Sequence, residues 1–237
     1  MRLKKSGSFG TVAMLAAWTL AGWGAAYAQE NASPYAKMAP ISEYRIADRD
    51  AEIALARSAA PPSISRDAEV RVLGTKGYET AVAGKNGFVC LVERAWAKDT
   101  TDPEFWNPKM RAPTCFNDVA VRSYLPISMK KTEWVLAGLS KEQVASKLQS
   151  AFANGEFVPP PSGAIAYMMS KEGYLSDRDR HWHPHVMFYV TSTDPRALGA
   201  DLDGSPVFAA RDDEQHFTVI FIPVDHWSDD SPDAIPH

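Results

Sequence analysis

The stretch SKEQVASKLQSAFANGEFVPPPSGAIAYMM, residues 140–169, passes from a helical pattern directly into a strand pattern. Ser140 and Gln143 form a capping box, in which the two side chains satisfy backbone N–H groups at the start of a helix. Apolar residues then recur at helical spacing, so we expect one face of this helix to pack on a sheet. These residues are Val144, Leu148, Ala151 and Phe152. Asn-Gly at 154–155 favours a helix end, and three prolines at 159–161 precede a predicted strand at 164–169.

Strand patterns also lie on both sides of this stretch, at 70–73, 78–82, 88–96, 185–190, 206–210 and 217–224. The turn sequence GKNG at 84–87 predicts that the second and third of these strands form a hairpin. Helices are predicted at 47–60, 117–124 and 128–139, with Pro126 ending the first of the last two. Strands, then helices, then strands without regular βαβ alternation predict an α+β fold. We expect a largely antiparallel sheet covered on one face by helices.

The first 28 residues have the pattern of a cleaved signal peptide. Arg2, Lys4 and Lys5 precede an apolar run, and Ala-Tyr-Ala at 26–28 offers the small residues that signal peptidase requires before Gln29. The run is almost long enough to be an uncleaved anchor, but its glycines and the cleavage sequence argue against that alternative. The sequence thus predicts an exported protein, periplasmic or secreted. It divides into a signal peptide (1–28), a leader and helix (29–62) and a single α+β domain with a polar C-terminal tail (63–237).

Composition limits the classes of function. The chain of 237 residues is 45% hydrophobic and 23% charged, which argues against disorder and against fibrous or coiled-coil structure. Removal of the signal peptide would leave 22 basic and 29 acidic residues, so the mature protein has no general attraction for nucleic acid or anionic lipid. We expect no nucleic-acid partner and no membrane association after cleavage. The partner is expected to be an unidentified small molecule or protein.

The chain contains two cysteines, Cys90 and Cys115. An even number of cysteines in an exported protein favours a disulfide bond, which would stabilise the fold by about 3 kcal/mol in the chain-entropy model. The alternative is two separate buried thiols, because Cys90 lies within the apolar run Phe-Val-Cys-Leu-Val at 88–92. The sequence favours the disulfide.

All six histidines lie after residue 180, and three of them form His-Trp-His-Pro-His at 181–185. Residues two apart on a strand share one face, so neighbouring imidazoles can bind one ion. Because proline tends to lie at a strand start or a bend, Pro184 predicts that His181 and His183 precede a strand beginning at His185. A bend there would bring all three rings to a shared point.

These three histidines are the predicted ligands of a divalent transition metal, Zn or Cu. If only two of them share the ion, His216 is the first candidate for the third ligand, because it begins the strand pattern at 217–224 much as His185 begins its own. The function expected from such a site is metal binding or metal-dependent hydrolysis. The alternative is a metal-free cleft of histidine and tryptophan in a non-enzymatic binding or structural module, with Trp182 as the residue in contact with a bound molecule.

Signatures of other enzyme classes are weak or absent. Ser128 and Lys131 match the S-x-x-K pattern of penicillin-interacting enzymes, but about one such match is expected by chance in a chain of this composition. The mature sequence has no nucleophile elbow, P-loop or dinucleotide-binding glycine motif. The sequence therefore predicts a location and a candidate site, but no substrate.

Overall fold

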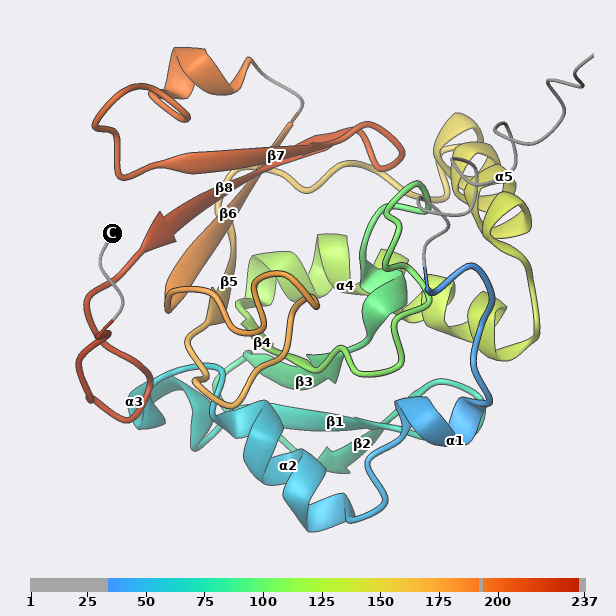
Figure 1. Ribbon diagram of the computed structural model, residues 1–237, viewed down its shortest axis with the longest axis horizontal. Coiled ribbons are helices and arrows are strands. Elements are labelled where there is room, and N and C mark those ends of the chain that lie inside the picture. Colours follow the sequence, from blue (N-terminus) through green and yellow to red (C-terminus); the bar gives the residue numbers. More distant parts are fainter. Residues whose placement is uncertain (1–33, 192–193, 235–237) are drawn as a thin grey trace, which may run out of the picture. The chain divides into compact units, whose positions relative to one another are not determined.

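The computed structural model describes residues 34–191 and 194–234. Its centre is an eight-stranded sheet with the order β2-β1-β3-β4-β5-β6-β8-β7 (Figure 1). The strands are β1 (Glu69–Leu73), β2 (Tyr78–Val82), β3 (Val89–Glu93), β4 (Ala112–Phe116), β5 (Ala164–Met168), β6 (His185–Thr191), β7 (Phe208–Asp212) and β8 (Phe217–Pro223). All neighbouring pairs are antiparallel except β1 and β3. The α+β prediction, with a largely antiparallel sheet, is confirmed.

In the described residues, five α-helices accompany the sheet: α1 (Ile41–Tyr44), α2 (Arg49–Arg57), α3 (Pro62–Ser65), α4 (Asp118–Leu136) and α5 (Lys141–Ala153). Helix α4 packs on one face of the sheet, against Val89 and Leu91. Helix α2 packs on the other face, against Cys90 and Val92, because successive residues of β3 point to opposite faces. Helices therefore lie on both faces of the sheet, and not on one face as expected. In the part of the chain that the structure describes, no helix is both long and apolar enough to cross a membrane. The predicted signal peptide lies outside the described residues.

The predicted hairpin between 78–82 and 88–96 is wrong, although both strands form. β2 pairs with β1, and β3 pairs with the opposite edge of β1 in parallel. After β2 the chain crosses close to the start of β1, where a Cβ on Gly84 would lie 2.2 Å from the backbone nitrogen of Glu69. Lys85 N–H also donates to the carbonyl oxygen of Asp67. The glycines at 84–87 therefore permit a close crossing rather than a hairpin turn.

Helix α4 also differs from the prediction, because it continues through Pro126 where two helices were expected. A proline removes one hydrogen-bond donor, and the tertiary contacts of a long helix can outweigh that loss. The side chain of Asn117 caps the helix as predicted, by accepting from the N–H of Ala120.

The capping box at the start of α5 is confirmed. The apolar face of α5 packs against α4 and the loop that contains Trp106, however, and not against the sheet as expected.

Strand β4 was not predicted, because its residues were expected to belong partly to a proline-containing loop. The N–H of Arg111 donates to the carbonyl oxygen of Tyr174, on the side of β4 that faces β5. The backbone nitrogen of Pro113, two residues later, points to the same side of β4 as the N–H of Arg111. Pairing between β4 and β5 begins only at Cys115. A proline fits here because no strand requires its missing N–H.

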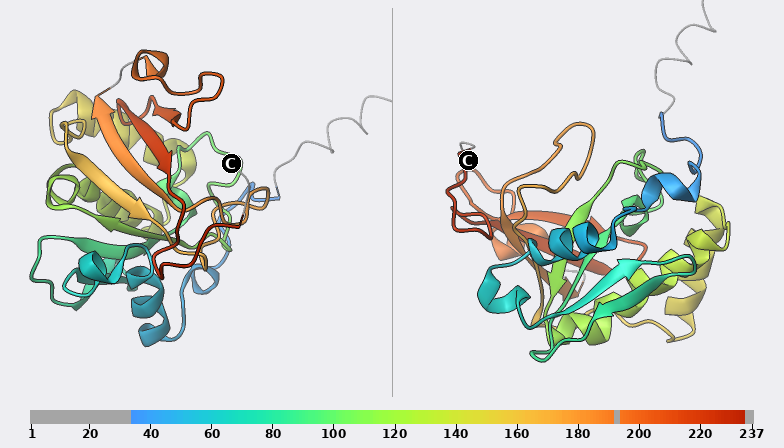
Figure 2. Two further views of the ribbon diagram at one scale, coloured as in Figure 1. Left: turned by 90° about the vertical axis from the view of Figure 1, so that its left-hand side faces the viewer. Right: turned by 90° about the horizontal axis from the view of Figure 1, so that it is seen from below.

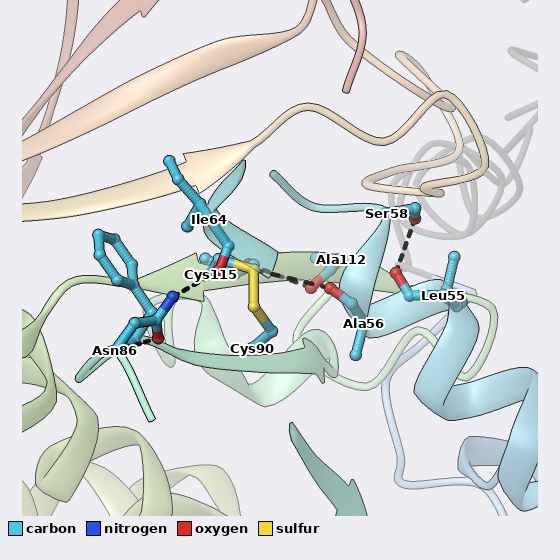
Figure 3. The surroundings of a disulfide bond; sticks show 10 residues. Leu55, Ala56, Ser58, Ile64, Asn86, Cys90, Ala112 and Cys115 are labelled. Carbon is cyan, nitrogen blue, oxygen red and sulfur yellow. Dashed lines mark hydrogen bonds between the residues drawn. A yellow bond between two sulfur atoms is a disulfide. The ribbon is translucent and has the colours of Figure 1, made fainter. Parts of the chain in front are cut away.

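The disulfide bond between Cys90 and Cys115 is confirmed. The two residues are directly opposite each other on β3 and β4. Figure 3 shows the bond with Ala56 of α2 on one side of it and Ile64 of α3 on the other. Both cysteines are fully buried, so the disulfide links the two strands on the face that α2 covers.

The face of the sheet that carries α4 also carries the candidate site. The sheet curves, and α4 lies in its hollow between β3 and the β6–β8 pair (Figures 1 and 2). Pairing places Met168 opposite His185, and Met187 opposite Phe221. Beside α4, this hollow face is therefore lined by thioether, aromatic and imidazole side chains.

Candidate functional site

The predicted histidine cluster lies directly before β6, and its three rings have different neighbours. Nδ1 of His185 lies 2.6 Å from the carbonyl oxygen of His183. Nδ1 of His183 lies 2.6 Å from Oδ2 of Asp233. The ring of His181 packs edge-on against Trp227, with 5.7 Å between the ring centroids. Two of the three rings thus contact the C-terminal segment.

His216 lies at the opposite end of the sheet from His185. Strands β6 and β8 are neighbours, but they are antiparallel. His185 pairs with Pro223, which lies six residues beyond Phe217 on β8 and therefore about 20 Å from it. The ring of His216 packs edge-on against Phe152 of α5, with centroids 5.1 Å apart. His216 therefore does not join the cluster, because antiparallel neighbours begin at opposite ends of a sheet.

Across residues 34–191 and 194–234, no group of three or more His, Cys, Asp or Glu side chains is placed to hold a metal ion. The convergence of His181, His183 and His185 on one point is not seen, and a Zn or Cu ion on these residues stays a prediction from the sequence. The structure instead brings His185 and Trp182 together at a largely apolar cleft.

His185 is buried, with 2% of its surface exposed, and shares one face of β6 with Met187 and Tyr189. A carbonyl oxygen only accepts hydrogen bonds, so Nδ1 of His185 donates to His183 and carries the proton of the neutral ring. Burial lowers the pKa of His185 to about 4, which favours this neutral form near pH 7. Nε2 is consequently the bare nitrogen, able only to accept a hydrogen bond or to bind a metal.

Trp182 lies over His185, with their ring centroids 4.9 Å apart. Its indole also contacts Phe208 and Phe221 edge-on, at centroid distances of 5.6 and 6.0 Å. These two phenylalanines are directly paired on β7 and β8. The four rings form an aromatic group at the open edge of the sheet, which we call the aromatic wall.

The aromatic wall borders a cavity of about 560 Å³. Its other apolar lining residues are Met110, Met168, Leu175 and Ala209. A second cavity of about 400 Å³ adjoins the first and shares Lys98, Met110, Met168 and Phe221 with it. Because the two cavities have these lining residues in common, they form one continuous site, which we call the cleft. Drug-sized ligands occupy cavities of 300–1,000 Å³ in general, so the cleft is large enough for a small molecule.

Glu93 lies at the end of the cleft away from the aromatic wall. Its carboxylate accepts a hydrogen bond from Oγ of Ser128 at 3.0 Å. The hydroxyl groups of Tyr124 and Thr114 lie at 3.4 Å from its two oxygens. Burial raises the pKa of Glu93, because the loss of water around its charge outweighs the hydrogen bond from Ser128 and the positive charge of Lys131. The cleft therefore has one buried carboxyl group at one end and one buried imidazole at the other.

Ser128 and Lys131, the S-x-x-K match, do not form a nucleophile with its base. Ser128 donates to Glu93, and Nζ of Lys131 donates to the carbonyl oxygens of Lys98 and Ala97, at 2.7 and 3.5 Å. The two side chains thus bind different groups. This geometry agrees with the expectation that the S-x-x-K match occurs by chance.

Most of the residues that line the cleft were not predicted from the sequence. Glu93 carried a signal, because it is an acidic residue inside a run predicted to be a buried strand. Met110 carried none, since it lies in the segment expected to be a loop. Met168 and Met187 were placed on predicted strands, but only the pairing of β5, β6 and β8 brings them beside Phe221.

Comparisons of this chain with protein-family models, with curated proteins and with solved structures found no match.

Proposed function

We propose that this protein is a binding module that holds a small, largely apolar molecule in its cleft, without a metal ion. The observation that carries the proposal is the cleft itself. Two adjoining cavities, of about 560 and 400 Å³, lie over the hollow face of the sheet and are walled by aromatic and thioether side chains. Apolar walls with a few placed polar groups are the usual composition of small-molecule sites.

Burial disfavours the charged forms of two polar groups in the cleft, His185 and Glu93. His185 is neutral near pH 7, because its pKa is lowered to about 4, and the pKa of Glu93 is raised. An anionic ligand would lose its water without gaining a positive charge at either group. These two residues therefore support an uncharged ligand.

The methionines provide a direct test of binding. Met110, Met168 and Met187 line the cleft, whereas Met129 and Met169 are not among its lining residues. Protein labelled with [13C]methyl-methionine is titrated with 1-octanol, toluene and phenol. We expect saturable shifts of the first three methyl resonances and much smaller shifts of the other two. If no compound shifts the cleft methyls more than those of Met129 and Met169, the proposal is wrong.

A second candidate function is binding of Cu(I), favoured by a specific observation. Three thioether groups, from Met110, Met168 and Met187, line one cavity, and the bare Nε2 belongs to His185 on the paired strand. Thioether and imidazole groups are suitable ligands for Cu(I). This donor set differs from the three histidines that the sequence predicted.

The copper proposal is tested by anaerobic competition with bicinchoninic acid, which forms a coloured Cu(I) complex. One equivalent of Cu(I) should pass to the protein, and Met168→Leu should weaken that transfer, with Met129→Leu as the matched control. Elemental analysis of the purified protein for Zn and Cu tests the original prediction in parallel. Failure to withdraw Cu(I) from the chelator would overturn the second candidate.

We also propose that the protein acts outside the cytoplasm, in the periplasm or after secretion. The N-terminal pattern at residues 1–28 and the disulfide between Cys90 and Cys115 support this location. Expression in a Gram-negative host followed by N-terminal sequencing of the periplasmic fraction is the test. The expected first residue is Gln29, and full-length protein found only in the cytoplasm would contradict the proposal.

A further inference from the structure

We infer that the ligand of the cleft is a neutral aromatic molecule that donates a hydrogen bond, from a hydroxyl or N–H group, to Nε2 of His185. This inference rests on the proposed binding function and names the chemical class of the ligand. It is carried by the fixed tautomer of one buried imidazole and by the rings beside it.

The tautomer of His185 decides which partner its free nitrogen accepts. Nδ1 donates to the carbonyl oxygen of His183 at 2.6 Å, so in the neutral ring Nε2 has a lone pair and no proton. Among the described residues, no hydrogen bond of the structure involves Nε2. His185 is 2% exposed and lines the cleft, and Nε2 is not among the fully enclosed unpartnered atoms of the described residues, so this acceptor is open to a partner from the cleft. A ligand with only acceptor groups would leave it unsatisfied.

The aromatic wall favours a flat ligand with its own π-system. Trp182, Phe208 and Phe221 all line the cleft, and the indole meets both phenylalanines edge-on. Edge-to-face and offset contacts between rings stabilise beyond simple burial of area. A phenol or indole placed against Trp182 would present its O–H or N–H near the imidazole that Trp182 covers.

Two cations at the rim of the cleft, Lys98 and Arg178, are already paired with carboxylates, so they do not require an anionic ligand. Lys98 lies within 3.6 Å of carboxylate oxygens of Asp102 and Glu104. The guanidinium of Arg178 binds both carboxylate oxygens of Asp179, at 2.8 and 2.9 Å. The recognition expected at this end of the cleft is therefore a single hydrogen bond between neutral groups, together with ring contacts.

Phenol and anisole form a matched pair of probes. They have the same ring and similar size, but only phenol can donate a hydrogen bond. In titrations of methionine-labelled wild-type protein, we expect phenol to bind about tenfold more tightly than anisole. In the variant His185→Phe the preference should fall to within about twofold, while the exposed His226→Phe should keep the wild-type preference.

A measurement on the wild-type protein keeps the inference testable if His185→Phe does not fold. Long-range 1H–15N spectra of histidine-labelled protein report the state of each ring nitrogen. We expect phenol to shift the Nε2 resonance of His185 and anisole to leave it nearly unchanged.

The outcomes separate this inference from the proposed function. Equal affinity for phenol and anisole, with no movement of the Nε2 resonance, would overturn the inference while leaving the cleft as a binding site. Binding of 1-octanol without binding of either aromatic probe would also overturn only the ligand class. Absence of cleft methyl shifts with every probe would overturn both.

Discussion

The imidazole of His185 donates from Nδ1 to the carbonyl oxygen of His183, two residues earlier in the chain. This short local bond holds a neutral, buried ring in one tautomer at the start of β6. A sequence pattern that suggests metal binding thus contributes, at its third histidine, a hydrogen-bond acceptor that faces an apolar cleft. The chemistry that follows from this arrangement depends on pH.

Burial of His185 should make the protein less stable in acid. Its folded-state pKa is about 4, below the ordinary value of 6.5, so between these values the unfolded chain binds a proton that the folded chain does not. The stabilisation is present above pH 6.5 and is lost as pH falls toward 4, to a total of about 3 kcal/mol. The free energy of unfolding is measured with urea at pH 7.5 and at pH 4.5. Its decrease between these two pH values should be smaller for His185→Phe than for the wild type. An unchanged loss in that variant would refute the assignment, and His226→Phe serves as the control.

Glu93 should have the opposite pH dependence. Its folded-state pKa is raised from the ordinary 4.5, so its contribution is present below pH 4.5 and is lost as pH rises through the folded-state value. Glu93→Gln removes this titration and should gain stability relative to wild type as pH rises from 4.5 to 8. The measurement is the difference in unfolding free energy between variant and wild type at each pH. A difference that is constant with pH would contradict the prediction.

The buried pair of Arg94 and Glu52 should be important for stability. Nη2 of Arg94 lies 2.8 Å from Oε1 of Glu52, and the two side chains are 0% and 3% exposed. Glu52→Gln leaves the guanidinium buried without its counter-charge, so we expect a loss of about 3–5 kcal/mol in the free energy of unfolding.

The exposed pair of Arg49 and Glu79, with side chains 51% and 58% exposed, is the matched control. Glu79→Gln should cost less than about 1 kcal/mol. Similar costs for Glu52→Gln and Glu79→Gln, measured by urea denaturation, would show that burial does not govern the effect.

Removing the disulfide should lower stability without changing the fold. The bond closes a loop between residues 25 positions apart, so the double variant Cys90→Ala/Cys115→Ala should lose about 3 kcal/mol. The measurement is the urea midpoint, with circular dichroism to confirm the secondary structure. Wild-type protein in reductant should behave like the double variant. A midpoint insensitive to reductant would rule out a stabilising disulfide.

Gly84 should tolerate no side chain, because the chain crosses the start of β1 there. A Cβ at this position would lie 2.2 Å from the backbone nitrogen of Glu69, which cannot move without disturbing the β1–β3 pairing. We expect Gly84→Ala to cost at least about 2 kcal/mol. At Gly173 the nearest atoms lie at 3.4 Å, so Gly173→Ala should cost less than about 1 kcal/mol. The measurement is the midpoint of thermal unfolding of the two variants. Equal midpoints would contradict the close approach of Gly84 to the start of β1.

Local signals predicted the elements well where one side chain or one spacing decides them. The capping box of Ser140 and Gln143, the cap at Asn117 and the strand patterns after residue 160 all correspond to observed elements. The disulfide was predicted from the number of cysteines and the predicted compartment. Interactions of this kind act within a few residues, or follow from composition, and a single sequence contains them.

The pairing between strands could not be predicted from the sequence, because it depends on which strands lie side by side after folding. The GKNG turn at 84–87 is compatible both with a hairpin and with a crossing, and only contact with β1 selects the crossing. Helix α4 continues through Pro126 because its apolar residues pack into the hollow of the sheet. Likewise, His216 precedes a strand next to β6 yet lies at its far end, since the direction of pairing is a tertiary property.

The sequence by itself determined that this chain forms an α+β protein with a disulfide and an unusual group of histidines. Only the tertiary structure decided what surrounds them. It separated the imidazoles among different partners, and it brought Glu93, three methionines and the aromatic wall to one cleft. The physical reason is that periodicity and composition are local, whereas a binding cavity is formed by side chains from strands that are distant in sequence and adjacent only after folding.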